Sequence, residues 1–227
     1  MEKDKLDNPS WYALSEDHQD FAVGYDGIKF YQPDYCPFGG FENPDATEDG
    51  IDAYASLTNT FFVIGKQPRF SGRVQLQNEL VCNQMILKNR IARETDERIT
   101  ELKTDNHKAD LFGLVNLGQP GYFRASTSDL GNYYGIYKGN MLVAVAGERM
   151  KMTGFTELSA IVTHPAHTGK GYAKQLITHA SHAVFNEGKI PYLHVTTNNA
   201  GAIRLYEKLG FTTRRKISFW HFTICKN

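Results

Sequence analysis

Apolar residues recur at helical spacing in three segments of the second half of the chain. Residues 108–121 show the spacing of one helix face, with Asp105 or Asn106 as the expected N-cap and Pro120–Gly121 as the stop. Residues 171–188 predict an amphipathic helix that Gly188 closes, and residues 198–211 predict a third helix that begins at an asparagine cap. The apolar positions of the first two helices are Leu111, Leu114, Val115, Ala173, Leu176, Ile177, Ala180 and Val184.

Strand-like apolar runs alternate with these helices. Residues 132–150 predict two strands around a turn at 138–140, and single strands are expected at 155–162, 191–197 and 214–224. The resulting order is helix, hairpin, strand, helix, strand, helix, strand. This order predicts an α+β fold with a mixed, mostly antiparallel sheet flanked by helices.

The first 95 residues have a different pattern. Seven aromatic residues fall between positions 21 and 41 among prolines and glycines, which indicates loops and short strands. Residues 59–65 predict a buried strand, 72–87 one or two strands, and 93–106 an exposed strand or a connection. We therefore expect a smaller α/β domain over 1–95 and a second domain over 96–227. We also expect the first domain to pack on the second and to shape its site.

Composition and charge narrow the function classes. The chain has 227 residues, with 25 Lys and Arg against 25 Asp and Glu, so it lacks the basic excess that nucleic-acid binders usually carry. It contains no apolar run of the length that a membrane helix needs, and its charged first residues do not predict a signal peptide. Three dispersed cysteines without a CxxC pair favour a reducing, cytoplasmic location. We expect neither a nucleic-acid nor a membrane partner.

The segment THPAHTGKGYAKQL at 163–176 places two glycines between a predicted strand and a predicted helix. Gly169 and Gly171 can adopt the positive φ that aligns backbone N–H groups around an anion, and a helix N-terminus adds partial positive charge. A plain strand-to-helix turn explains the glycines equally well. The segment lacks the P-loop pattern, and Lys174 stands where a dinucleotide fingerprint needs its third glycine, which argues against a nicotinamide-dependent oxidoreductase.

A second motif about twenty residues later decides between these interpretations. Val162, Pro165, Gly169, Gly171 and Ala173, followed by N-x-x-A-x-x-L-Y-x-x-x-G-F at 199–211, resemble the two motifs of the GNAT superfamily of acyl-CoA-dependent N-acyltransferases. The resemblance covers roughly residues 96–227. Thr168 departs from the family pattern, which has arginine or glutamine there, so one phosphate contact is missing unless Lys170 replaces it.

The resemblance implies a binding site for acetyl-CoA as co-substrate. The family's pyrophosphate loop falls on Thr168, Gly169, Lys170, Gly171, Tyr172 and Ala173, and its pantetheine-pairing strand falls on Ala160, Ile161 and Val162. A backbone N–H near Val162 is expected to polarise the thioester carbonyl. Asn199 is expected to hold pantetheine, unless it only caps its helix. Tyr206 matches the tyrosine that protonates the departing thiolate, with a buried core tyrosine as the alternative.

The attacking amine must lose a proton, and two residues are candidates for the base. Glu157 opens the strand that leads to Val162, where many GNAT members carry glutamate. His194 occupies the position at which a GNAT branch, the ribosomal-protein alanine acetyltransferases, has its glutamate. Strand alternation puts His194 with Tyr192 and Thr196 on one face, and Glu157 with Ser159 and Ile161 on another that lines the same cleft. We favour Glu157, acting directly or through water, over His194.

The sequence therefore predicts an N-acetyltransferase that moves an acetyl group from acetyl-CoA to a primary amine by direct attack on the thioester. The alternatives are a non-catalytic CoA-binding sensor and an acyltransferase with a longer acyl or an aminoacyl donor. The acceptor is expected to be a small-molecule or peptide amine, and the protein a monomer or homodimer. His164 and His167 lie in a proline-containing loop without further ligands, so no metal is expected.

Overall fold

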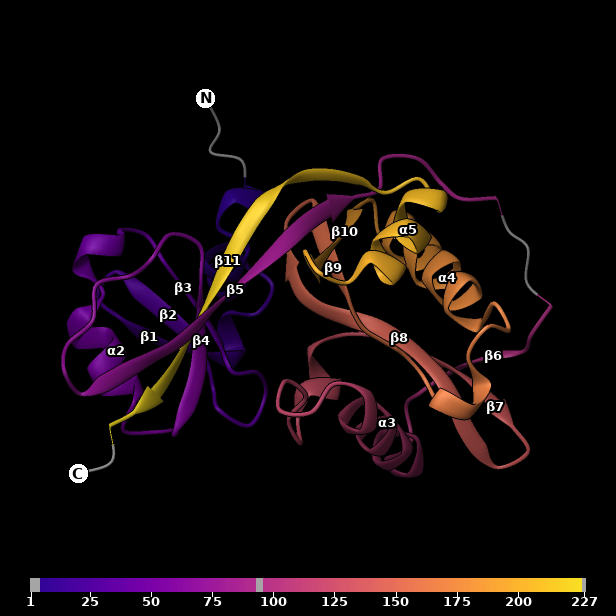
Figure 1. Ribbon diagram of the computed structural model, residues 1–227, viewed down its shortest axis with the longest axis horizontal. Coiled ribbons are helices and arrows are strands. Elements are labelled where there is room, and N and C mark those ends of the chain that lie inside the picture. The colour runs from indigo at the N-terminus through magenta and orange to yellow at the C-terminus, as the bar shows by residue number, and fades with distance from the viewer. Residues whose placement is uncertain (1–4, 93–95, 226–227) are drawn as a thin grey trace.

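A computed structural model describes residues 5–92 and 96–225 of the chain. The described strands form one sheet in the order β1-β2-β3-β4-β11-β5-β10-β9-β8-β7-β6 (Figure 1). The strands are β1 (Ala22–Tyr25), β2 (Ile28–Tyr31), β3 (Phe38–Phe41), β4 (Thr60–Ile64), β5 (Val74–Ile86), β6 (Ile99–Glu101), β7 (Tyr133–Lys138), β8 (Met141–Met152), β9 (Phe155–Thr163), β10 (Ile190–Thr196) and β11 (Thr212–Ile224). The helices are α1 (Pro9–Ser15), α2 (Glu48–Tyr54), α3 (Asp105–Gly118), α4 (Tyr172–Asn186) and α5 (Ala200–Lys208).

The predicted elements of the second half are confirmed, and so is the fold class. The 72–87 segment is the single long strand β5, and the part of segment 93–106 that the structure describes contains the short strand β6, while residues 93–95 lie outside the described residues. The expected cap of α3 is wrong by one position. Thr104 is the N-cap, because its hydroxyl accepts a hydrogen bond from the His107 amide and the His107 side chain bonds back to the Thr104 amide. Helices α1 and α2, of seven residues each, are too short to show a periodic pattern.

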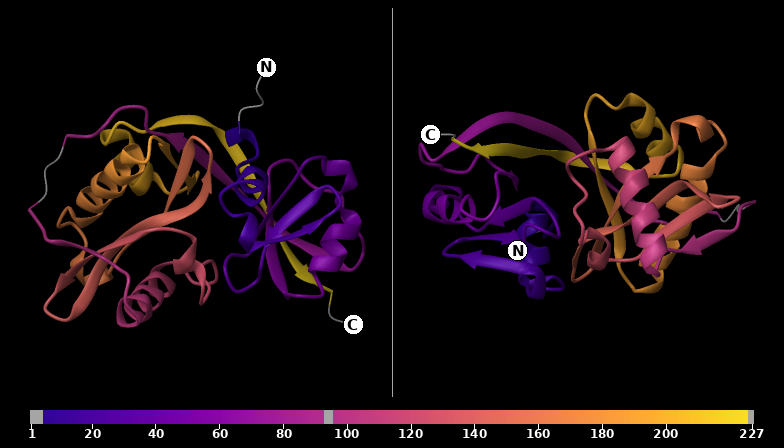
Figure 2. Two further views of the ribbon diagram at one scale, coloured as in Figure 1. Left: turned by 180° about the vertical axis from the view of Figure 1, so that it is seen from behind. Right: turned by 90° about the horizontal axis from the view of Figure 1, so that it is seen from below.

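Two long strands join the two halves of the chain. β5 and β11 pair antiparallel from Thr212↔Ile86 to Ile224↔Val74. One end of this ribbon pairs with β4 of the first half, and the other end pairs with β10 of the second half. Figures 1 and 2 show the ribbon running from one half to the other. The division at residue 95 stays a prediction, but the backbone hydrogen bonds of the sheet cross it.

Helices cover both faces of the second half of the sheet. Ala144 and Ala146 of β8 belong to the apolar cluster beneath α4 and α5, whereas Val145 between them packs with α3. This alternation puts α3 and α4 on opposite faces. The first half has its own aromatic core, in which Phe30 stacks on Tyr54 with ring centroids 4.0 Å apart. The aromatic residues between positions 21 and 41 therefore belong mainly to the core.

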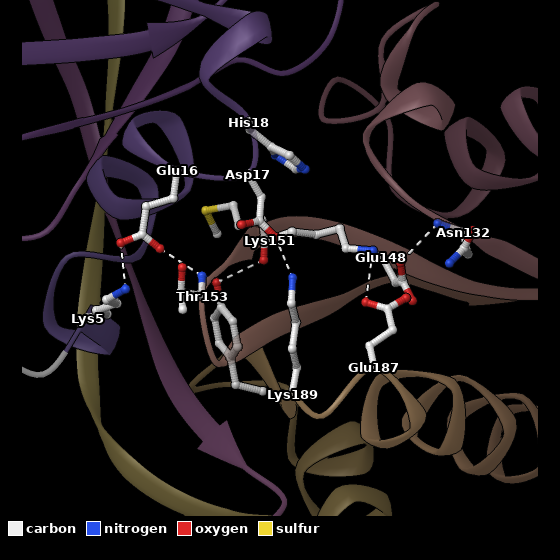
Figure 3. A network of polar contacts seen from close by, with 12 residues as sticks. Lys5, Glu16, Asp17, His18, Asn132, Glu148, Lys151, Thr153, Glu187 and Lys189 are labelled. Carbon is white, nitrogen blue, oxygen red and sulfur yellow. Dashed lines mark hydrogen bonds and ion pairs between the residues drawn. The ribbon is translucent and has the colours of Figure 1, made fainter.

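A polar network also ties the end of α1 to the second half (Figure 3). Glu16 accepts a hydrogen bond from Lys5 at 2.6 Å and another from the backbone amide of Thr153, in the β8–β9 turn, at 2.7 Å. Asp17 pairs with Lys189, directly before β10. These contacts fix the loop after α1 against the turn that precedes β9.

We expect the fragment 96–227 to be insoluble or inactive on its own. The fragment lacks β4 and β5, which leaves both edges of β11 and one edge of β10 without hydrogen-bond partners, and such edges promote aggregation. Size-exclusion chromatography and thiol release from acetyl-CoA measure the two effects. The full chain expressed as two pieces, 1–95 and 96–227, is the matched control and should recover solubility. A soluble, monomeric and fully active 96–227 fragment contradicts this expectation.

Candidate active site

The central feature of the site is an opening between β9 and β10. The two strands pair in parallel only over 155–157 and 190–192, and the last pair is Tyr192↔Glu157. β9 continues to Thr163 and β10 to Thr196, without a further pair between them. Beyond Glu157, the edge of β9 that faces β10 therefore has backbone groups available to a ligand.

A β-bulge lies in the open part of β9. Ser159 pairs with Gly147 and Val162 with Val145, so two residues of β9 oppose one residue of β8. Ala160 has a φ of +50°, the only positive φ of a non-glycine residue in the described chain. A conformation of this kind is costly and typical of functional sites. One prediction about this strand is wrong. Ile161 packs with the cluster beneath α4 and does not share the face of Glu157, because the extra residue of the bulge reverses the alternation of side chains along β9.

A cleft of about 370 Å³ occupies the opening. Residues 158–161 of β9 and 194–196 of β10 form its sides, and Asn199 and Tyr206 line the end next to α5. The other end is built by aromatic and apolar residues, partly from the first half of the chain, namely Phe38, Leu80, Cys82, Tyr122 and Phe219. The first half thus supplies walls of the cleft, as the sequence predicts. A separate hollow of about 350 Å³ lies against Trp11 and Phe41, away from the strand opening.

The glycine turn precedes α4 near the mouth of the opening. Gly169 and Gly171 have φ values of +77° and +75°, and Gly171 is the N-cap of α4. Nothing lies within 4 Å of a Cβ built on either glycine, so the turn has free space around it. The Thr168 hydroxyl donates to the carbonyl of Pro165 at 3.2 Å. The sequence prediction of positive φ at both glycines is confirmed.

Asn199 and Tyr206 lie on α5 as predicted. The Asn199 side chain accepts a hydrogen bond from the Ala202 amide at 3.1 Å, so it caps the helix, and it also lines the cleft. Tyr206 is 7% exposed, and burial raises the pKa of its hydroxyl to about 12. Its ring packs on Phe211 with centroids 5.9 Å apart. Asn199 therefore both caps its helix and lines the cleft. Tyr206 is both a core tyrosine and a residue of the cleft.

The two candidate bases contact each other. Nδ1 of His194 lies 2.7 Å from Oε1 of Glu157. The guanidinium of Arg149 binds the same carboxylate with two hydrogen bonds, from Nε at 2.8 Å and from Nη2 at 2.7 Å. Glu157 is fully buried, and although burial raises its pKa, the charge of Arg149 and the hydrogen bonds lower the pKa to about 2. Glu157 is therefore an ionised carboxylate behind His194, and it is not among the residues that line the cleft.

The second nitrogen of His194 faces Gln84 of β5. The Gln84 amide nitrogen lies 3.2 Å from Nε2 of His194 and also donates to the carbonyl of Leu6 at 2.7 Å. The amide oxygen of Gln84 accepts from Arg214 at 3.0 Å, which fixes the amide orientation. An amide N–H directed at Nε2 selects the neutral tautomer with its proton on Nδ1 and its lone pair on Nε2.

Among the described residues, no group of three or more His, Cys, Asp or Glu side chains is arranged to hold a metal ion. The rings of His164 and His167 lie 5.8 Å apart in the loop after β9. None of the described helices is long and apolar enough to cross a membrane.

Comparisons with known proteins agree with this architecture. The family model described as FR47-like protein matches residues 133–220. A protein of known structure from Novosphingobium aromaticivorans, assigned to the GNAT family, is 26% identical and superposes with a TM-score of 0.86 over 99% of this chain and 100% of that one. Residues 133–220 thus match the FR47-like family, and over nearly its whole length the chain is similar to an acetyltransferase of the GNAT family.

Two further relatives match this chain at lower identity or over a shorter stretch. A GCN5-related N-acetyltransferase from Kribbella flavida is 14% identical with a TM-score of 0.63, covers 95% of this chain and 96% of its own, and supports the fold alone. A stretch of 54 residues is 46% identical to the spermidine N(1)-acetyltransferase of Vibrio cholerae. That stretch spans 22% of this chain and 31% of the relative, which is about a third of the relative's length.

Sequence reasoning missed three features of this site: Arg149, Gln84 and the bulge at Ala160. Arg149 and Gln84 are 8 and 110 positions away from the residues they contact, on strands whose register only the folded sheet determines. The one available signal was Arg149 itself, a charged residue within the apolar run of β8.

We expect the stability that Glu157 provides to depend on pH. Its pKa is depressed from 4.5 to about 2, so the contribution is complete above pH 4.5 and is lost as the pH falls through about 2. Glu157→Gln should lower the free energy of unfolding by about 3–5 kcal/mol at pH 7, because Arg149 loses its buried partner. Urea denaturation measures the difference, and it should shrink between pH 4.5 and 2. The exposed Glu42→Gln is the control, and a difference that does not vary with pH contradicts the ion pair.

Proposed function

We propose that this protein transfers an acetyl group from acetyl-CoA to a primary amine by direct attack of the amine on the thioester. One observation carries the proposal: the strand opening brings the bulge at Ala160, Tyr206 and His194 to one cleft. The similarity to GNAT acetyltransferases supports the acyl-CoA donor class. The acetyl group and the primary amine are our inference. The location in the cytoplasm is also part of the proposal, and three free cysteines support it.

Acetyl-CoA is assigned to two places among the described residues. The pyrophosphate is assigned to the turn of Gly169 and Gly171, with its open space and the N-terminus of α4 behind it. The pantetheine is assigned to the unpaired edge of 160–162, where it bonds as an added strand does, with Asn199 opposite. Lys170 and the amides of 168, 172 and 173 complete the phosphate site. The Thr168 hydroxyl donates to the carbonyl of Pro165. This agrees with the loss of one phosphate contact relative to the family pattern.

His194, rather than the sequence-favoured Glu157, is the base in this proposal. Glu157 holds two hydrogen bonds from Arg149 and has a pKa of about 2, so it is a weak proton acceptor. Its role is to orient His194 through Nδ1. The incoming amine displaces the 3.2 Å contact of Gln84 and gives its proton to Nε2.

Bond making and breaking then follow in order. The amine nitrogen forms a bond to the thioester carbon, and the carbonyl oxygen takes the electron pair while a backbone N–H of 160–162 stabilises its charge. The carbon–sulfur bond breaks as the carbonyl re-forms, and Tyr206 donates its proton to the thiolate. The resulting tyrosinate takes the second proton of the amine nitrogen, which leaves the amide with a single N–H. Burial keeps this phenol protonated, and the thiolate that forms in the same apolar surroundings is also more basic than in water.

No cysteine takes part in the proposed reaction. Cys82 lines the cleft, but burial raises its pKa to about 12, which leaves too little thiolate for a nucleophile. A covalent acyl-enzyme is therefore not needed.

The cofactor turn is tested by Gly171→Glu, which places a negative side chain where the phosphates are assigned. We expect loss of CoA binding in calorimetric titration while the fold survives. Gly188→Glu is the matched control, because Gly188 closes α4 with a φ of +72° and equally free space, so it carries the same strain and charge. If Gly171→Glu binds CoA as the control does, the turn is not the phosphate site.

The base is tested by His194→Gln. We expect kcat/KM to fall by about 10²–10⁴, as for other general bases. Glu157→Gln should give a smaller loss, since the imidazole stays but is less well oriented. His221→Gln, on β11 and outside the cleft, controls for loss of a histidine. If His194→Gln and Glu157→Gln both keep the wild-type rate, solvent takes the proton.

The acid is tested by Tyr206→Phe, which keeps the packing on Phe211 and removes the hydroxyl. We expect kcat to fall by roughly tenfold to several hundredfold, the range for loss of a proton donor, with little change in acetyl-CoA affinity. Stopped-flow turnover and calorimetry measure the two quantities. Unchanged turnover shows that the thiolate leaves without this proton.

A further inference from the structure

We infer that the acceptor is an α-amino acid with an apolar or aromatic side chain, recognised through its carboxylate by Arg149. The inference rests on the proposed function and narrows the class of amine. It follows from three properties of the end of the cleft that the first half of the chain helps to build.

The first property is the wall of that end. Phe38 and Phe219 meet edge to face with centroids 5.5 Å apart, and the ring of His194 lies 5.2 Å from Phe219. Tyr122 lies 6.5 Å from Phe38 and is half-buried, whereas Phe38 and Phe219 are only 2% and 3% exposed. The row of rings leads from Tyr122 inward to the proposed base. Such a wall favours an acceptor with an apolar body.

The second property is the charge that reaches the cleft. Among the described residues that line it, Arg149 carries the only permanent charge, and none is Asp or Glu. In the ion pair with Glu157 the arginine side chain is 13% exposed and the glutamate 1%, so a ligand meets the guanidinium and not the carboxylate. A polyamine would bring additional ammonium groups to a site without a carboxylate to receive them, which is costly.

The third property is the fixed orientation of Arg149. Nε and Nη2 both bind Glu157, and the guanidinium lies 4.5 Å from the centre of the Phe38 ring. No hydrogen bond of Nη1 is found among the described residues, so its N–H groups remain for a ligand. A guanidinium held in this way is suited to a carboxylate, because its donors are already oriented.

The spacing of Arg149 and His194 suits an α-amino acid. Oε1 of Glu157 is 2.7 Å from Nδ1 of His194 and 2.7 Å from Nη2 of Arg149, so the imidazole and the guanidinium meet at one oxygen atom, and their remaining nitrogens, Nε2 and Nη1, belong to neighbouring groups. An α-amino acid carries its amine and its carboxylate on one carbon. It can therefore place the amine at the imidazole, the carboxylate at the guanidinium and its side chain along the aromatic wall.

The test compares acceptors with the wild-type protein and acetyl-CoA, with thiol release and the mass of the product as readouts. Phenylalanine and phenethylamine differ only in the carboxylate, and phenylalanine and alanine differ only in the ring. We expect kcat/KM for phenylalanine to exceed both others by at least tenfold, and spermidine to be a poor acceptor. Phenethylamine, phenylalaninamide or spermidine as an equal or better acceptor overturns the inference, and reaction of the amide would indicate a peptide N-terminus.

Two variants test whether Arg149 and Tyr122 cause these differences between acceptors. Arg149→Lys keeps the charge but not the planar donors, and should raise KM for phenylalanine about tenfold more than KM for phenethylamine, whatever its shared effect on the base. Tyr122→Ala should raise KM for phenylalanine but not for alanine, and Tyr122→Phe should restore it. Equal effects on both members of a pair overturn the assignment. If acetyl-CoA binds but no amine in the panel increases thiol release, the proposed function itself is wrong and the inference fails with it.

Discussion

The buried ion pair between Arg149 and Glu157 lies at the point where the sheet opens. Glu157 is the last residue of β9 that pairs with β10, and directly beyond it the strands separate. A fully buried carboxylate requires compensation, and here it receives two hydrogen bonds from Arg149 and one from His194. The same contacts orient the imidazole and present the guanidinium to the cleft. Removing Glu157 would therefore affect stability, the proposed base and the proposed acceptor site together.

The first half of the chain completes this arrangement and is not an appendage. β5 supplies Gln84, whose amide is held by Leu6 and Arg214 and faces His194. Phe38 of β3 stacks against the guanidinium of Arg149. These contacts depend on the long β5–β11 ribbon. Its strand β5 pairs with the open end of β10, so the ribbon brings the first half of the chain to the opening. The proposed donor side of the cleft belongs to the second half, and the proposed acceptor side is shared by both halves.

Local features of the fold were predictable from the sequence because they depend on neighbours in the chain. The helix periodicity of α4, the positive φ of Gly169 and Gly171, and the cap at Asn199 are of this kind. Strand alternation also predicted that Glu157 and His194 face one site. The contact of Gln84 with His194 depends instead on the register of β5 against β10, and the bulge at Ala160 depends on how β9 pairs with β8. No local pattern specifies either, and none predicts the ion pair of Arg149 with Glu157.

The most direct test of the account is a crystal structure of the chain with a ketone analogue of acetyl-CoA, in which a methylene group replaces the thioester sulfur. We expect the pyrophosphate at the turn of Gly169 and Gly171, and the pantetheine along the open edge of β9. The carbonyl oxygen should lie within hydrogen-bond distance of a backbone N–H of 160–162, with the acetyl group pointing toward His194. A pantetheine arm bound outside the opening between β9 and β10 would contradict the account.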